Sequence, residues 1–227
     1  MISERKAYLL GVLAGDGSIR FRAHKYEYSV KCVGNPRDET RYYDEVLKPL
    51  FYSEFGVQVF PKLHDASKTY GFTVYSKRLY TELLSLGLPS GRKHPSLRVP
   101  KVVCSSQDLR ISFLRGVMDT DGCLTFKKRY TQTPYYSVIT LSSQTKEFVQ
   151  QLERVMRSCG LRPVPIYDYP VNHNRRQEPT VINRLELNGR SQLACWMEHI
   201  GFWNPKHTSK LLMYGKEKYW ERQDSQL

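Results

Sequence analysis

The chain contains an internal repeat, and this repeat limits the folds that it can adopt. The segment LLGVLAGDGSIRF (residues 9–21) returns as LRGVMDTDGCLTF (114–126), with two glycines and one aspartate at matching positions. Three further pairs of segments match in the same order: residues 28–35 with 136–143, 70–88 with 181–202, and 92–96 with 205–209. Four matches in one order indicate two copies of one structural unit.

Each copy has the same predicted order of elements. A helix ending in Asp-Gly comes first, and a segment of alternating polar and apolar residues, typical of paired strands, follows it. A second helix, two more strands and a last helix complete the unit. The first copy has these elements at residues 7–15, 18–33, 39–51, 57–63, 70–75 and 77–86; the second has them, after its own Asp-Gly helix, at 123–141, 145–160, 163–168, 181–188 and 190–200. The sequence therefore predicts an α+β fold of two αββαββα repeats.

The 227 residues of the chain are enough for one large domain or two small ones. We expect the repeats at residues 1–100 and 101–227, with a linker near 96–109. Pro100 lies in this linker, and Ser105 or Ser106 is the expected N-cap of the next helix, with Asp108 in its first turn.

The charge of the chain favours a polyanionic partner. Lys and Arg number 35 against 22 Asp and Glu, which gives a net charge of +13. Such an excess is typical of proteins that bind nucleic acid, although a merely basic soluble protein is the alternative. The sequence has no basic amphipathic helix, and its longest early apolar run, Tyr8 to Ala14, is too short for a signal peptide or a membrane span. We therefore expect no membrane partner.

The cysteines indicate a reducing compartment. There are five of them, scattered through the chain and without a CxxC pair. An odd number argues against a secreted disulfide framework, so we expect reduced and mostly buried thiols. The predicted location is intracellular, cytoplasmic or organellar, and not secreted.

The first helix of each copy carries small residues on one face. Gly11 and Gly15 are four residues apart, as are Gly116 and Thr120 in the second copy. A glycine inside a helix costs about 1 kcal/mol relative to alanine, so its recurrence calls for a reason. Small residues on one face let two helix backbones approach closely. We therefore expect these helices to pack on each other along a pseudo-twofold axis.

An aspartate ends each of these helices, where the helix dipole disfavours a negative charge. If the helices cross closely, Asp16 and Asp121 lie near each other, and their repulsion raises a pKa unless a cation neutralises them. A hard divalent cation such as Mg²⁺ takes oxygen ligands from a few carboxylates together with water and phosphate. The repeated acids therefore predict a metal site.

Residues 9–17 and 114–122 together resemble the paired signature of the single-chain, two-motif LAGLIDADG homing endonucleases. The resemblance covers nearly the whole chain. It implies saddle-shaped antiparallel sheets facing double-stranded DNA, and a monomer that cleaves both strands of a long, non-palindromic target. It also implies Mg²⁺ as the cofactor, with two or three divalent ions in the DNA complex.

The resemblance also assigns site residues. The eighth motif position holds the metal ligand, hence Asp16 and Asp121, with Gly15 and Thr120 beside them in the metal site. Asp119, the sixth-position acid, has Ala14 as its counterpart, so we give it a packing or solvent-facing role. A polar residue at a strand end and a lysine beyond the last helix of each unit complete the implied catalytic set: Gln144, Asn35, Lys93 and Lys206. The lysines could instead be ordinary phosphate contacts.

The strands are the expected DNA-reading surface, because an antiparallel ribbon fits the major groove with alternate side chains toward the bases. Arg20 and Arg22 share one parity with His24, Tyr26 and Tyr28, unless a turn near Ala23–Tyr26 breaks the register. The other candidates are Lys31, Lys62, His64, Lys68, Tyr70, Lys127, Arg129, Thr131, Gln132, Tyr135, Asp168, Asn172, His173, Arg175 and Arg176. Any of these could contact phosphate rather than a base.

Two related functions remain open at this stage. An RNA-splicing maturase, with intron RNA as a partner, would keep the fold and the basic surface, and so would a non-catalytic DNA-binding protein. Retention of both acids and both lysines favours the nuclease. An intein is disfavoured because the splicing nucleophile and the terminal His-Asn pair are missing, and the NHN at 172–174 reads as a hairpin tip.

Overall fold

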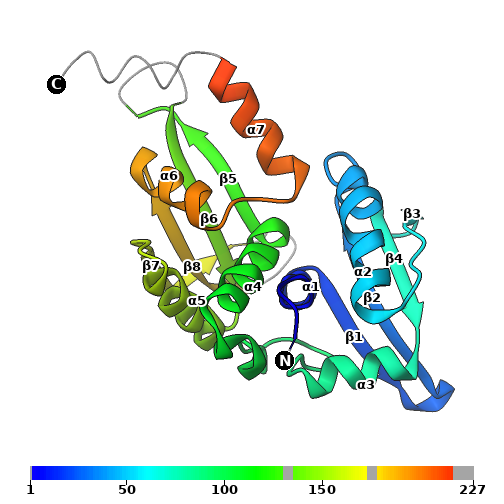
Figure 1. Ribbon diagram of the computed structural model, residues 1–227. Helices are drawn as coiled ribbons and strands as arrows, with labels where there is room; N and C mark the ends of the chain where they lie inside the picture. Colours follow the sequence, from blue (N-terminus) through cyan, green and yellow to red (C-terminus); the bar gives the residue numbers. More distant parts are fainter. Residues whose placement is uncertain (1, 130–134, 173–177, 217–227) are drawn as a thin grey trace.

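The computed structural model describes residues 2–129, 135–172 and 178–216. It contains the predicted αββαββα order twice and one further helix at the C-terminal end (Figure 1). The first repeat comprises α1 (Glu4–Gly15), β1 (Gly17–Arg22), β2 (Glu27–Gly34), α2 (Lys48–Phe55), β3 (Lys62–His64), β4 (Thr69–Tyr75) and α3 (Lys77–Ser85). The second comprises α4 (Gln107–Thr120), β5 (Gly122–Lys127), β6 (Tyr136–Ser143), α5 (Lys146–Ser158), β7 (Val164–Val171), β8 (Thr180–Asn188) and α6 (Arg190–His199), and α7 (Pro205–Lys216) follows.

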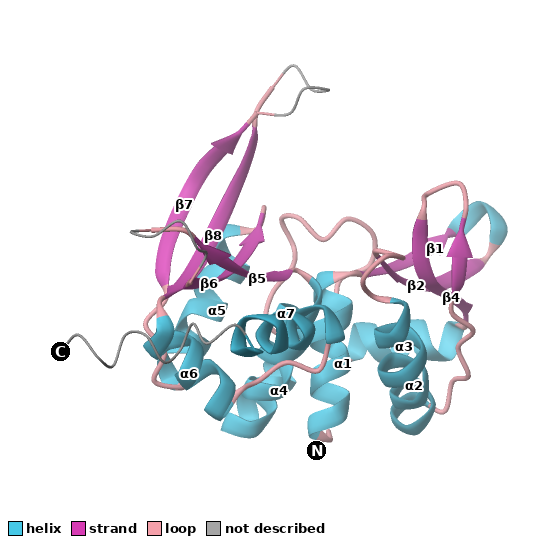
Figure 2. Cartoon of the chain, turned by 90° about the horizontal axis from the view of Figure 1, so that it is seen from above, coloured by secondary structure: helices cyan, strands magenta, loops and turns pink. Residues whose placement is uncertain are grey.

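Each repeat forms one antiparallel sheet. The strand orders are β1-β2-β4-β3 and β5-β6-β8-β7, so the two sheets have the same topology. The helices lie on one side of the sheets and leave the opposite sheet faces open, as Figure 2 shows. The buried side chains of the helices and of the covered sheet faces form a single hydrophobic core that spans both repeats.

The two repeats meet where α1 crosses α4. A Cβ added to Gly116 would lie 2.1 Å from the carbonyl oxygen of Tyr8, and one added to Gly11 would lie 2.1 Å from that of Phe113. A Cβ on Gly15 would likewise collide with the side chain of Thr120. The helix backbones therefore touch at the small residues, and the C-terminal ends of both helices reach the same region of the molecule.

Serine caps fix the starts of the helices. Ser3 and Ser106 each accept a hydrogen bond from a backbone N–H of the first turn, and Ser106 rather than Ser105 caps α4. Together with the glycine contact, these caps set where the aspartates at the other ends of α1 and α4 lie.

Several boundaries differ from those expected. The strand predicted at 57–63 is only Lys62–His64, because Pro61 has no N–H to donate and pairing begins after it. The helix predicted at 39–51 extends to Phe55 and contains a π-helical stretch at Tyr42–Leu47. Helix α7 was not predicted, although Pro205 at its first position and Asn204 as its N-cap are a recognisable start signal: the Asn204 side chain accepts from the backbone N–H of Lys206 at 3.0 Å.

The thiols are less buried than expected. All five cysteines are free, but only Cys32 and Cys159 are buried, whereas Cys104 is exposed and the other two are half-buried. Cys104 lies in the linker, where few side chains cover it. Among the described residues, no helix has the length and apolar character needed to cross a membrane.

Candidate active site

Asp16 and Asp121 directly follow α1 and α4 and precede the first strand of each sheet. Their backbone N–H groups still donate to Val12 and Val117, at 2.9 Å in both cases, so each aspartate is the C-cap of its helix. A Cβ on Gly15 would lie 3.4 Å from the carboxyl carbon of Asp121, which shows how closely the end of α1 approaches the second acid. The helix crossing therefore brings the two repeated acids into one site.

The site is short of positive charge relative to its carboxylates. Burial, followed by the charges of Asp121 and Glu39, raises the pKa of Asp16 to about 7, although Lys206 and Lys93 oppose this. The pKa of Asp121 is raised as well: the surrounding protein removes much of the hydration of its carboxylate, even though part of the residue is open to solvent. A divalent cation between these groups would relieve the repulsion.

The two repeat-matched lysines have matching contacts. The Nζ of Lys93 donates to the carbonyl oxygen of Gly15, and the Nζ of Lys206 donates to that of Thr120 at 2.9 Å. Each lysine thus binds the residue immediately before the aspartate of its own repeat. Burial lowers the pKa of Lys93, against the opposing charges of Asp121, Cys32 and Asp16. Lys206 lies beyond α6, as expected, and within the first turn of α7.

Asn35 and Gln144, the polar residues proposed at strand ends, directly follow β2 and β6. The side chain of Asn35 forms a local turn after β2: its Oδ1 accepts from the N–H of Arg37 at 3.0 Å and its Nδ2 donates to Asp38 at 3.3 Å. Gln144 lines a separate cleft with Arg92 and His94. In the described part of the chain, neither side chain forms a hydrogen bond with Asp16 or Asp121.

A third carboxylate, which the sequence did not single out, lies beside the two aspartates. Glu39 is 4% exposed, and its Oε1 accepts from Lys206 at 2.8 Å. Its sequence context, RDETRYY, reads as an ordinary helix start. Only its burial and its contact with the other repeat reveal its place in the site.

The donor set fits a hard divalent cation. It consists of the Asp16 and Asp121 carboxylates and the carbonyl oxygens of Gly15 and Thr120, and Mg²⁺, Mn²⁺ and Ca²⁺ prefer such oxygen ligands. Among the described residues, no three His, Cys, Asp or Glu side chains converge as a metal site. Water and a bound phosphate would therefore supply the other ligands.

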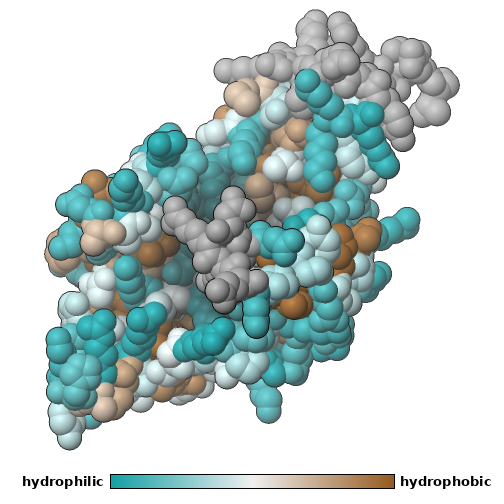
Figure 3. All heavy atoms as spheres, turned by 180° about the vertical axis from the view of Figure 1, so that it is seen from behind, coloured by the Kyte–Doolittle hydropathy of each residue, from teal (hydrophilic) through white to brown (hydrophobic). Residues whose placement is uncertain are grey.

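The strand pairing defines which side chains lie on the open face of the first sheet. Ser18 pairs with Lys31, Arg20 with Ser29 and Arg22 with Glu27, and these positions alternate with the buried Ile19 and Val30. The open face of this sheet includes the proposed contacts Arg20, Arg22, Lys31, Lys62 and His64. Figure 3 views this side of the molecule, where hydrophilic side chains predominate around a hollowed surface.

Tyr28 and Tyr70, two of the proposed DNA contacts, lie on the other, helix-covered face. For Tyr28 the reason is the turn near Ala23–Tyr26, which was expected to break the strand register. A 3₁₀ turn at Ala23–Lys25 and the left-handed Tyr26 change the alternation between β1 and β2. Tyr28 consequently stacks on Phe21, with ring centroids 4.5 Å apart. Tyr70 donates a hydrogen bond to Asp44 at 2.9 Å. The same turn leaves His24 and Tyr26 exposed at its tip, and Lys68 occupies the turn between β3 and β4.

The proposed contacts of the second sheet are only partly described. Lys127 lies on the open face opposite Tyr136, and the guanidinium of Arg129 lies 4.4 Å from the centroid of the Tyr136 ring. Asp168, at a bulge in β7, pairs with Lys146 and so neutralises a cation beside the sheet. Tyr135 and Asn172 border the tips of the two hairpins. Thr131, Gln132, His173, Arg175, Arg176 and most of the NHN segment lie outside the described residues.

Comparison with known proteins identifies the fold. Residues 108–201 match the family of LAGLIDADG-like domains. The chain has the two-repeat LAGLIDADG fold. The structure of I-DmoI, described as a homing endonuclease and solved in complex with DNA and Ca, has 17% identity and a TM-score of 0.64 over 92% of this chain and 97% of that chain.

Two other solved structures resemble this chain in fold. The I-LtrWI LAGLIDADG homing endonuclease bound to target DNA has 10% identity and a TM-score of 0.56, over 95% of this chain and 91% of its own. Full-length DUF199/WhiA from Thermatoga maritima has 14% identity and a TM-score of 0.51, over 94% of this chain and 60% of its own. A sequence comparison with curated proteins gave no match.

The sixth position of the second LAGLIDADG motif, Asp119, has a packing role. It is fully buried, accepts a hydrogen bond from Tyr8 at 2.8 Å, and accepts another from the backbone N–H of Trp203 at 3.0 Å. Tyr8 comes from α1, so this acid ties the first repeat to the segment before α7. The packing role expected for Asp119 is therefore confirmed, and the alternative, a solvent-facing role, is wrong.

The raised pKa of Asp16 predicts how stability depends on pH without metal. The unfolded chain releases this proton near pH 4, whereas the folded chain keeps it until about pH 7, so the folded state binds more protons in between. The free energy of unfolding should therefore fall by about 1–3 kcal/mol as pH rises from 4 to 8 in EDTA. Asp16→Asn should flatten this slope in urea titrations at both pH values. Identical slopes for the variant and the wild type would contradict this origin.

Proposed function

We propose that the chain is a site-specific endonuclease that cuts both strands of a long, non-palindromic DNA duplex with a divalent cation, Mg²⁺ by preference. The observation that carries this proposal is the convergence of Asp16 and Asp121, each with a matched lysine, between two sheets whose open faces carry cations such as Arg20 and Lys127. Structures of I-DmoI with DNA and Mn or Ca support the choice of ligand and of metal class.

Each residue of the site has a separate role in the proposed reaction. Asp16 and Asp121 hold the metal, with the carbonyl groups of Gly15 and Thr120 beside them. When bound, the cation polarises the scissile phosphate and lowers the pKa of an attacking water. Lys93 and Lys206 stabilise negative charge that develops on the phosphate, one lysine in each half-site.

The open sheet faces hold the duplex. Arg20, Arg22 and Lys31 in the first repeat and Lys127 in the second are the cations that we assign to the DNA. The two open faces carry different residues, so each half would read a different sequence. One chain would therefore cover the whole target, and we propose a monomer, with one chain bound per duplex.

A randomised duplex library tests the function directly. The protein is incubated with the library in Mg²⁺, Mn²⁺ or Ca²⁺, and the cut ends and the retained duplexes are sequenced. We expect cut ends that converge on one non-palindromic site with a fixed overhang. Retention of a duplex without cleavage in all three cations would instead establish a non-catalytic DNA-binding protein. A parallel RNA-binding assay tests the maturase alternative, for which the structure adds no support.

A further inference from the structure

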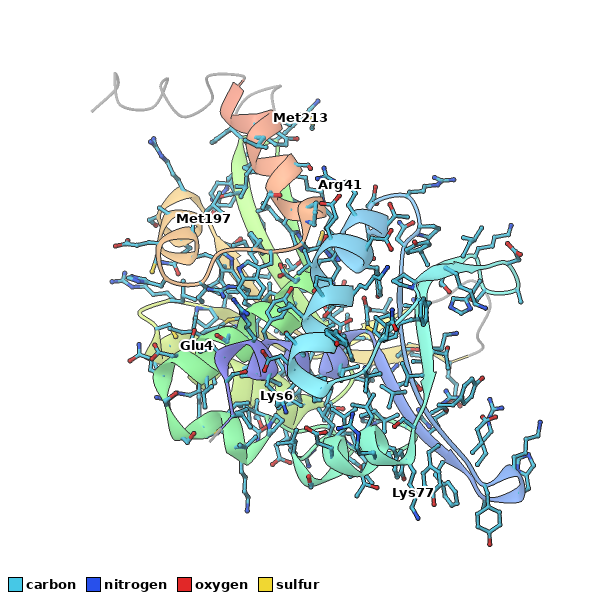
Figure 4. All side chains as sticks on the ribbon, turned by 45° about the vertical axis from the view of Figure 1, so that its right-hand side comes forward. Glu4, Lys6, Arg41, Lys77, Met197 and Met213 are labelled. Carbon is cyan, nitrogen blue, oxygen red and sulfur yellow. The ribbon has the colours of Figure 1, made fainter. Side chains whose placement is uncertain are left out.

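Glu39 is a buried carboxylate at the boundary between the repeats. Its Oε1 accepts from Lys206 at 2.8 Å and from the side-chain amide of Asn204 at 3.0 Å, and its Oε2 accepts from the backbone N–H of Asn35 at 2.7 Å. Figure 4 shows that Arg41, two residues later, lies beside the start of α7, whose far end is marked by Met213. Glu39 therefore reaches from the first repeat to the lysine of the second.

The second repeat has a neutral residue at the corresponding place. Glu39 and Thr145 each directly precede the first helical residue after the central strand, and they are 4% and 3% exposed. The Oγ1 of Thr145 lies 3.3 Å from the Nδ1 of His94, which follows Lys93. Each residue thus contacts the lysine-bearing segment of the other repeat. Only in the first repeat is that contact an ion pair with the lysine itself.

Because of this difference, Lys206 is held in place by more hydrogen bonds than Lys93. An ammonium group has three donors, and Glu39 and the carbonyl of Thr120 occupy two of those of Lys206, which leaves one free to point toward the site. Within the described residues, Lys93 has no carboxylate within ion-pair distance. Removing one partner of a buried pair leaves the other unsatisfied, so Lys206 depends on Glu39 for its position.

We propose that Glu39 is a positioning residue for Lys206 and makes the two half-sites unequal, so that loss of its carboxylate slows cleavage of one DNA strand. The inference rests on the proposed nuclease function. Its consequence is that the two strands have separate determinants: Lys206 with Glu39 for one strand, and Lys93 for the other.

Strand-resolved, single-turnover cleavage tests the proposal on a duplex that carries a different dye at each 5′ end. Glu39→Gln should slow one strand by about tenfold to a hundredfold, the scale of a small misplacement of a reacting group. Lys206→Met should slow the same strand, and the double variant should be no slower than Lys206→Met. Lys93→Met should slow the opposite strand. DNA affinity should stay unchanged, which separates positioning from binding.

Two further variants control for folding. Thr145→Val changes the counterpart of Glu39 without changing the charge. It should change the cleavage rate of neither strand by more than about twofold. Glu39→Asp keeps the charge and should retain more of the affected cleavage than Glu39→Gln, which a purely structural defect would not predict. Equal slowing of both strands by Glu39→Gln, or additive effects with Lys206→Met, would overturn the inference. A wild-type protein that cuts neither strand would overturn the nuclease function itself.

Discussion

Asp16→Asn or Asp121→Asn should lower DNA cleavage by at least about 10³-fold and leave DNA binding nearly intact. A bound cation contributes several kcal/mol to stabilising the transition state, and each 1.36 kcal/mol or so changes a rate tenfold. Asparagine keeps the shape of the side chain but binds the cation weakly. Cleavage is measured in Mg²⁺ on the target recovered from the library, and binding is measured by gel shift in Ca²⁺.

Glu4→Gln provides the matched control for this loss of charge. Glu4 is an exposed acid in the first turn of α1, at the opposite end of the helix from Asp16 (Figure 4). The Glu4→Gln variant should therefore cleave DNA at the wild-type rate, within experimental scatter. Because the two aspartates lie together and would hold the metal jointly, either single variant should suppress cleavage of both strands. Full cleavage by either aspartate variant would refute the metal assignment.

The two aspartates could be predicted because their signal is local and repeated. A short motif holds the helix glycine, the acid and the following glycine, and its second copy supplies an internal check. Lys93 and Lys206 could be paired for the same reason, since their segments match across the repeat. In these cases the sequence carries the information within a few neighbouring residues.

Glu39 could not be found in this way, because its meaning depends on a contact across the repeats. Nothing near it in sequence shows that the segment of Asn204 and Lys206 will cover it. The turn near Ala23–Tyr26 could be predicted, but its conformation could not: a 3₁₀ turn followed by the left-handed Tyr26 decides which face Tyr28 occupies. Turn conformation and contacts between repeats are decided by the assembled fold.

The crossing of α1 and α4 leaves no room for a side chain at position 116. Gly116→Ala should lower the free energy of unfolding by about 3 kcal/mol, because the added Cβ would meet the carbonyl oxygen of Tyr8 at 2.1 Å and force the helices apart. In an unobstructed helix the same change would stabilise the protein by about 1 kcal/mol. The sign of the change in the free energy of unfolding, measured by urea denaturation, therefore tests whether the backbones touch.

Gly15→Ala separates a backbone obstruction from a side-chain obstruction. The Cβ at position 15 would meet the Oγ1 of Thr120 at 2.0 Å and its Cβ at 2.9 Å. Thr120→Ala removes the Oγ1, so the double variant should recover much of the stability that Gly15→Ala loses. No side-chain truncation removes the carbonyl of Tyr8, so Gly116→Ala should remain destabilised in combination with Thr120→Ala. Rescue of both glycine variants would mean that side chains, rather than touching backbones, hold α1 and α4 at their spacing.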